Sequence, residues 1–218
     1  MRRIHAAIAI ALAALLGCSR GESLPKIGVS LLAKQDPFYQ QLQSAMEAAA
    51  APNGFSIQFA SADKSTQKQL GQVEDFIAQK VAAIVLCPVD SDAAAAAVDV
   101  AKRAGVPVFT ADIEAHSPDV VCHVASDNVA GGRAAAKALI AAMGEDGEVL
   151  IIDHPEVSSV QDRVRGFEDE VAKHPRVKIV GKPPGGGDRS RSDRAMQDAL
   201  HSHPNLRGVF GINDNTAL

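Results

Sequence analysis

Short apolar stretches alternate along this chain with longer segments in which apolar residues recur every three or four positions. Residues 27–32 (Ile-Gly-Val-Ser-Leu-Leu) are one such stretch, typical of a strand buried on both faces. The segment after it has the i, i+3, i+4, i+7 spacing of a helix that packs one face on a sheet, with apolar residues at Leu42, Ala45, Met46 and Ala49. Strands that alternate with single helices are expected to pair in parallel through right-handed crossovers.

The same alternation continues through the whole chain. Further strands are expected at residues 55–59, 82–86, 106–110, 120–124, 149–152, 177–180 and 206–212, and further helices at about 66–79, 92–104, 129–143, 159–173 and 190–201. A polar break at Ser126-Asp127 separates two stretches of similar pattern. The prediction is an α/β fold with two similar doubly wound parallel-sheet lobes, an N-terminal lobe at residues 26–126 and a C-terminal lobe at residues 127–218.

The first residues follow a different pattern. Met1-Arg2-Arg3 precedes an apolar run at residues 6–16, which is too short to span a membrane as a helix and suits the core of a signal peptide. The run ends in Leu-Leu-Gly-Cys18, and small residues before a cysteine resemble a bacterial lipoprotein signal in which Cys18 is lipidated. An ordinary secretory signal is the alternative. Both kinds of signal predict a protein of the periplasm or cell envelope. The lipoprotein signal also predicts a lipid anchor in a membrane, with residues 1–18 as the signal peptide and residues 19–25 as a linker.

Composition and motifs narrow the classes of function. The 218 residues are 46% apolar and 22% charged, as in a globular protein, and a net charge of −4 offers no attraction for nucleic acid. Cys87 and Cys122 fall in predicted buried strands, which favours small core residues over a disulfide. No Gly-x-Gly-x-x-Gly, P-loop or Gly-x-Ser-x-Gly motif follows a predicted strand, and the histidines lack metal-ligand spacing. We therefore expect no enzyme, no cofactor and no metal site.

Two aromatic residues follow the first predicted strand. Ligands of doubly wound sheets bind beyond the carboxyl ends of the strands, and Phe38 and Tyr39 stand there, after Asp36-Pro37, a pair suited to open a helix. An aromatic face at this place suits the C–H face of a sugar ring, and the Asp36 carboxylate suits sugar hydroxyls. Alternatively, Phe38 lies four residues before Leu42 and extends the apolar stripe of the helix.

Three polar residues follow other strands. Asp112 comes after the strand at 106–110 and either accepts ligand hydroxyls or caps a turn. Arg163 lies on the first turns of the helix predicted at 159–173, where a cation opposes the helix dipole. Its donors suit a ligand in the crevice, and a solvated arginine is the alternative. Asn213 follows the last strand and either caps the next helix or points its amide into the crevice.

Six segments together resemble, in order and spacing, the ribose-binding-protein-like family of periplasmic sugar-binding proteins: DPFYQQLQSAMEAAA, VLCPVDSDAAAAAV, GVPVFTAD, VASDNVAGGRAAA, RVRGF and VFGINDNTAL. The resemblance covers residues 26–218. It implies a fold of periplasmic binding protein-like type I, in which two hinged lobes close on a monosaccharide or small polyol and deliver it to an ABC transporter permease. Lactose-repressor-type regulators share this fold, but a secretion signal stands here where their DNA-binding headpiece would be. A monomer that binds no nucleic acid is expected.

The resemblance also implies roles for individual residues. The ligand-binding positions of the family fall on Asp36, Phe38, Tyr39, Asp112, Arg163 and Asn213, with Phe38 and Tyr39 as the sugar-stacking pair. Ile113 stands where an Arg is common, and Gly185-Gly186-Gly187 replace an aromatic that covers the other sugar face in ribose-type members. Ribose-type binding is therefore not expected.

The family continues beyond the position of Leu218 with a strand that carries a further ligand contact, so an incomplete second lobe and a truncated chain are expected. Two alternatives to transport stay open on the sequence. One is a receptor that presents its ligand-bound state to a sensor kinase or chemoreceptor, because such a receptor uses the same clamp. The other is a non-functional truncated remnant.

Overall fold

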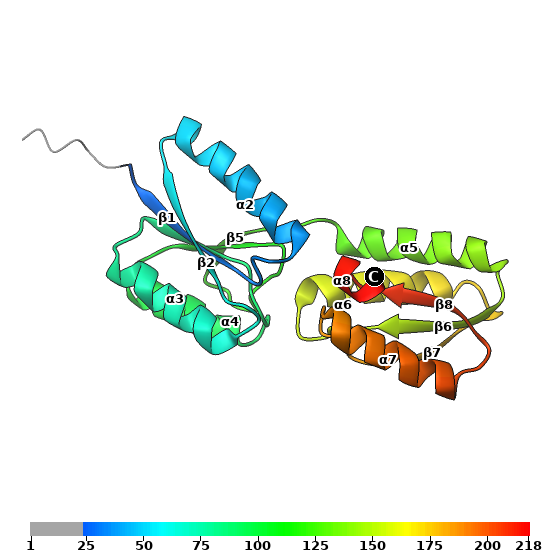
Figure 1. Ribbon diagram of the computed structural model, residues 1–218. Coiled ribbons are helices and arrows are strands. Elements are labelled where there is room, and N and C mark those ends of the chain that lie inside the picture. Colours follow the sequence, from blue (N-terminus) through cyan, green and yellow to red (C-terminus); the bar gives the residue numbers. More distant parts are fainter. Residues whose placement is uncertain (1–23) are drawn as a thin grey trace, which may run out of the picture.

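Two α/β lobes follow one another along the chain (Figure 1). The computed structural model describes residues 24–218, so the predicted signal peptide, its lipidation residue Cys18 and most of the predicted linker lie outside the described residues. The first lobe is a five-stranded parallel sheet in the order β2-β1-β3-β4-β5, built from β1 (Lys26–Leu31), β2 (Ser56–Ser61), β3 (Ala83–Leu86), β4 (Val108–Ala111) and β5 (Val120–Val124).

The second lobe has a three-stranded parallel sheet in the order β7-β6-β8. Its strands are β6 (Gly147–Ile152), β7 (Val177–Gly181) and β8 (Leu206–Gly211). The predicted α/β class with two doubly wound parallel-sheet lobes is confirmed, and the second sheet is the smaller of the two. In Figure 1 the carboxyl ends of β6 and β8 point toward the first lobe, so the loops that follow these strands meet that lobe.

Helices connect the strands except for β4 and β5, which a loop joins. The first lobe contains α2 (Pro37–Ala50), the short 3-10 turn η1 (Ala51–Asn53), α3 (Thr66–Ala78) and α4 (Ala94–Arg103); the second contains α5 (Asn128–Met143), α6 (Ser158–Val171), α7 (Arg189–Ser202) and α8 (Asp214–Ala217). Side chains of Ser65, Asp127 and Asp188 accept hydrogen bonds at the first turns of α3, α5 and α7, as N-capping residues do. None of the helices within residues 24–218 combines the length and the apolarity that a membrane crossing requires.

Helices α5 and α6 touch at two glycines. A Cβ added to Gly132 would lie 1.8 Å from the Arg163 carbonyl oxygen, and one added to Gly166 would lie 2.1 Å from the Val129 carbonyl oxygen. Only hydrogen fits at either place, so these glycines set the distance between the two helix backbones. The contact places α6, and with it Arg163, against the start of α5.

Two sequence predictions about burial need correction. In α2, Leu42 and Met46 are half-buried, but Ala45 and Ala49 are exposed, because only part of the predicted stripe meets the sheet. Cys87 is buried as predicted, whereas Cys122 is exposed because β5 is an edge strand with open side chains. Neither cysteine forms a disulfide.

Candidate functional site

A cavity of about 350 Å³ lies between the two lobes. This volume is at the lower end of the ~300–1,000 Å³ that is typical of small-molecule sites. From the first lobe it is lined by the loops after β1, β2, β4 and β5. From the second it is lined by the loops after β6, β7 and β8 and by the first turns of α5 and α6. The structure brings all six sequence-predicted ligand residues to this one cavity: Asp36, Phe38, Tyr39, Asp112, Arg163 and Asn213.

The two neighbouring aromatic rings have different environments. The Phe38 side chain is 48% exposed, whereas Tyr39 is 5% exposed and belongs to the apolar core. Their centroids lie 5.2 Å apart with the rings edge to face at 82°. Asp36 precedes them at the N-cap position of α2 but makes no side-chain capping hydrogen bond, so its carboxylate stays available to the cavity.

Asp112 is held at the carboxyl end of β4. Its φ of 69° is a left-handed conformation that Asp tolerates better than most residues, and its amide donates to the Val124 carbonyl at 2.9 Å. The Tyr39 hydroxyl donates to Asp112 Oδ2 at 2.7 Å. Burial raises the pKa of Asp112, while the Tyr39 hydrogen bond and the nearby Arg163 and His123 act against that rise.

Arg163 projects from the first turns of α6 and is braced on two sides. Its Nη2 donates to Asn128 Oδ1 at 2.6 Å, and its Nη1 donates to the Ile212 carbonyl. Burial lowers the pKa of Arg163, and the carboxylates of Asp112 and Asp214 oppose that shift. Among the contacts within residues 24–218 these two bonds use two of the five guanidinium donors, so the others remain for a ligand.

Asn213 caps helix α8 with its side-chain oxygen and also turns its amide nitrogen toward the cavity, so both roles considered from the sequence apply. Its Oδ1 accepts from the Thr216 amide at 3.0 Å and from the Thr216 hydroxyl at 2.7 Å, which caps α8. Its Nδ2 faces the loop after β7, where a Cβ at Gly187 would lie 3.1 Å from it. The cap fixes the oxygen and thereby directs the amide donor into the cavity.

Sequence reasoning missed several lining residues. Asn128, 8% exposed, accepts from Arg163 and donates to the Ser126 carbonyl at 3.1 Å. Lys64 Nζ donates to the Gly187 carbonyl at 2.9 Å and so joins the lobes. His154 is half-buried, and its burial lowers its pKa. Lys64 and His154 follow β2 and β6, at strand ends where a ligand can bind, but nothing in the local pattern distinguishes these side chains from solvated ones.

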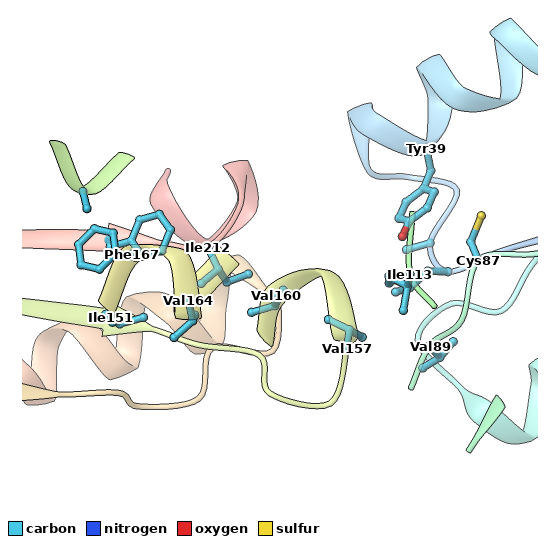
Figure 2. Packing of buried hydrophobic residues seen from close by; sticks show 14 of the residues in the cluster. Tyr39, Cys87, Val89, Ile113, Ile151, Val157, Val160, Val164, Phe167 and Ile212 are labelled. Atoms are coloured by element: carbon cyan, nitrogen blue, oxygen red, sulfur yellow. The ribbon is translucent and has the colours of Figure 1, made fainter. Parts of the chain in front are cut away.

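A second set of contacts joins the lobes beside the cavity. The Ser158 amide donates to Ser91 Oγ at 2.9 Å, and Ser158 Oγ accepts from the Glu114 amide at 2.9 Å. Val157 lies in the same apolar cluster as Val89 and Ile113 of the first lobe, and Figure 2 shows these three side chains close to one another. We call this set, made of Val89, Ser91, Glu114, Ile113, Val157 and Ser158, the lobe clasp.

Comparison with known proteins identifies the family. The family described as "Periplasmic binding protein domain" matches residues 27–218. The chain belongs to this family. The ribose import binding protein of Bacillus subtilis is 34% identical over 193 residues, which are 88% of this chain and 63% of that protein. The corresponding protein of Salmonella typhimurium is 32% identical over 184 residues, 84% of this chain and 62% of that protein. The chain therefore spans somewhat less than two thirds of these relatives.

Two solved structures have a similar fold. A solute-binding protein from Mycobacterium smegmatis with bound glycerol has a TM-score of 0.83 and 33% identity, covering 89% of this chain and 68% of that one. A solute-binding protein from Agrobacterium vitis with α-D-tagatopyranose has a TM-score of 0.83 and 31% identity, covering 88% and 68%. The relatives are binding proteins rather than enzymes.

Proposed function

We propose that this chain is the substrate-binding component of an ABC transporter and binds a monosaccharide or small polyol between its lobes. The observation that carries the proposal is the cavity itself. It sets an open aromatic face, Phe38, beside carboxylate acceptors on the first lobe and beside the guanidinium and amide donors of Arg163 and Asn213 on the second. A hydroxylated carbon skeleton presents C–H faces, donors and acceptors that match this arrangement. Relatives named for ribose and xylitol, and structures with glycerol and tagatose, support it.

The proposed mechanism is closure of two lobes around one ligand without catalysis. Phe38 packs on one face of the ligand, and the second-lobe loop after β7 contributes only the glycines Gly186 and Gly187 to the cavity, with no aromatic side chain. Stacking therefore comes from one side, and polar contacts supply most of the specificity. A ligand that bridges Asp112 on one lobe and Arg163 on the other favours the closed arrangement, because it binds fully only when the lobes meet.

The location and the partners belong to the same proposal. We expect lipidation at Cys18 to anchor the protein, as a monomer, to a membrane facing the periplasm or cell envelope, with residues 19–25 as linker before the lobes at 26–126 and 127–218. The macromolecular partner would be an ABC transporter permease. Mass spectrometry of the N-terminus of the protein produced in a bacterial envelope tests the first step: a diacylated or triacylated Cys18 supports it, and an unmodified residue after cleavage elsewhere contradicts it.

Thermal shift and calorimetry test ligand binding. The protein is purified after processing by its host and mixed with glycerol, xylitol, myo-inositol, D-ribose, D-allose and D-tagatose. Saturation at about 100 times Kd stabilises a folded protein by ~2.7 kcal/mol, which raises the melting temperature of a chain of this size by roughly 5–10 °C. At least one of these compounds should produce that shift. If none does, the proposed function is wrong.

A further inference from the structure

Tyr39 lines the cavity, but almost all of its side chain is enclosed by the protein. The residue is 5% exposed and packs in the cluster that contains Cys87 and Ile113 (Figure 2). Phe38 meets it edge to face and remains half-exposed. A ring that is 5% exposed offers little face to a ligand, whereas the buried hydroxyl of a tyrosine usually has a hydrogen-bond partner.

That polar end is directed at one atom. The Tyr39 hydroxyl donates to Asp112 Oδ2 at 2.7 Å, across 73 positions of sequence. The other carboxylate oxygen, Oδ1, accepts no hydrogen bond from residues 24–218, and Asp112 lines the cavity. One oxygen of the carboxylate is therefore held by the protein, and the other is the acceptor that a ligand meets.

We propose that Tyr39 is a positioning residue: its hydroxyl fixes the rotation of the Asp112 carboxylate so that Oδ1 faces a single ligand hydroxyl. The inference rests on the proposed sugar or polyol site and deepens it. A phenylalanine at position 39 would fill the same space but leave Oδ2 unpaired and the carboxylate free to rotate. Preorganisation of this kind lowers the cost of binding, because the acceptor does not have to be ordered when the ligand arrives.

The groups around Asp112 determine the pH at which its carboxylate is ionised, so the proposal predicts a pH dependence of ligand affinity. Arg163 on α6 and His123 on β5 favour its ionised form, and so does the Tyr39 hydroxyl, whereas burial opposes it. The Cys87 thiol, beyond β3, is buried beside it, and that burial raises the thiol pKa, so Cys87 brings no charge. Loss of the Tyr39 hydroxyl should therefore raise the pKa of Asp112 further, and the ionised acceptor should disappear at a higher pH.

The substitution Tyr39→Phe separates positioning from stacking, because it keeps the ring and removes only the hydroxyl. For the compound of the six-member panel that binds wild type most tightly, calorimetry should show Kd about tenfold weaker. The pH at which affinity falls to half should also move upward. A Tyr39→Phe variant with unchanged Kd and an unchanged pH profile overturns the proposal, since a stacking or merely structural ring would behave that way. In an Asp112→Asn background the same substitution should have no further effect on Kd.

A ligand-free measurement keeps the inference distinct from the proposed function. Tyr39 is the only tyrosine, and the chain has no tryptophan, so phenolate absorbance reports on this residue alone. Burial and the Asp112 carboxylate together raise the pKa of Tyr39 well above its usual value. Asp112→Asn should lower the midpoint of this spectroscopic titration. An unchanged midpoint contradicts the Tyr39–Asp112 pair even if sugars bind, whereas a shifted midpoint without any sugar binding leaves the pair intact and refutes the proposed sugar or polyol site.

Discussion

Removal of the Phe38 ring tests whether this residue is the stacking surface of the cavity. A phenylalanine side chain has ~150–250 Å² of surface, and 48% of Phe38 is exposed, so about 100 Å² is open. A ligand that covers half of that area removes about 50 Å² of ring surface and a similar area of its own from water. At ~25 cal/mol per Å² the burial of about 100 Å² in total contributes about 2.5 kcal/mol, and Phe38→Ala should weaken Kd roughly seventyfold.

Calorimetry with the tightest-binding compound of the panel measures the change, and a second phenylalanine provides the control. Phe55 is 37% exposed and does not line the cavity; it lies by the apolar groove under α2. Phe55→Ala should lower the melting temperature by a few degrees, as Phe38→Ala does, and leave Kd unchanged. If Phe38→Ala binds within twofold of wild type, or if both variants lose affinity equally, the ring does not stack on the ligand.

Three further substitutions test other parts of the structure. Burial raises the folded-state pKa of Asp112, and the stability linked to this shift is present below the unfolded-state pKa and lost as pH rises through the folded-state pKa. Asp112→Asn should therefore melt higher than wild type at pH 7, with a difference that shrinks in acid. Gly132→Ala forces a methyl group against the Arg163 carbonyl oxygen and should lower the free energy of unfolding, measured with denaturant, by about 3 kcal/mol. Ser91→Ala leaves the Ser158 amide of the lobe clasp without its acceptor, and Kd should rise severalfold in calorimetry.

For each of these three substitutions, one result would contradict the prediction. If the difference in melting temperature between Asp112→Asn and wild type grows on acidification, folding lowers the pKa of Asp112 instead of raising it. Gly131→Ala is the matched control for the helix contact, because a Cβ there meets nothing within 4 Å, and equal losses at both glycines would remove the close approach as the cause. Unchanged affinity in Ser91→Ala would show that the lobe clasp does not contribute to closure.

Much of the fold and part of the cavity could be predicted from local pattern. The apolar runs and the helical stripes define strands and helices one at a time, and each depends on neighbours within a few residues. The rule that ligands bind beyond strand ends then selects the loops, and all six selected residues line the cavity. The role of Asn128 could not be predicted from local pattern, because its hydrogen-bond partner, Arg163, lies 35 positions away in the sequence.

Periodicity and turn residues act over short distances, so local pattern was enough to predict the order of strands and helices and the loops at which a ligand could bind. Tertiary structure alone decided the environment of each side chain. Phe38 and Tyr39 are adjacent in sequence, yet the turn at the start of α2 leaves one ring open and buries the other against Asp112. Likewise, only the meeting of α5 and α6 explains Gly132 and Gly166. Burial and hydrogen-bond partners depend on segments far apart in the chain, and no local pattern encodes which of them meet.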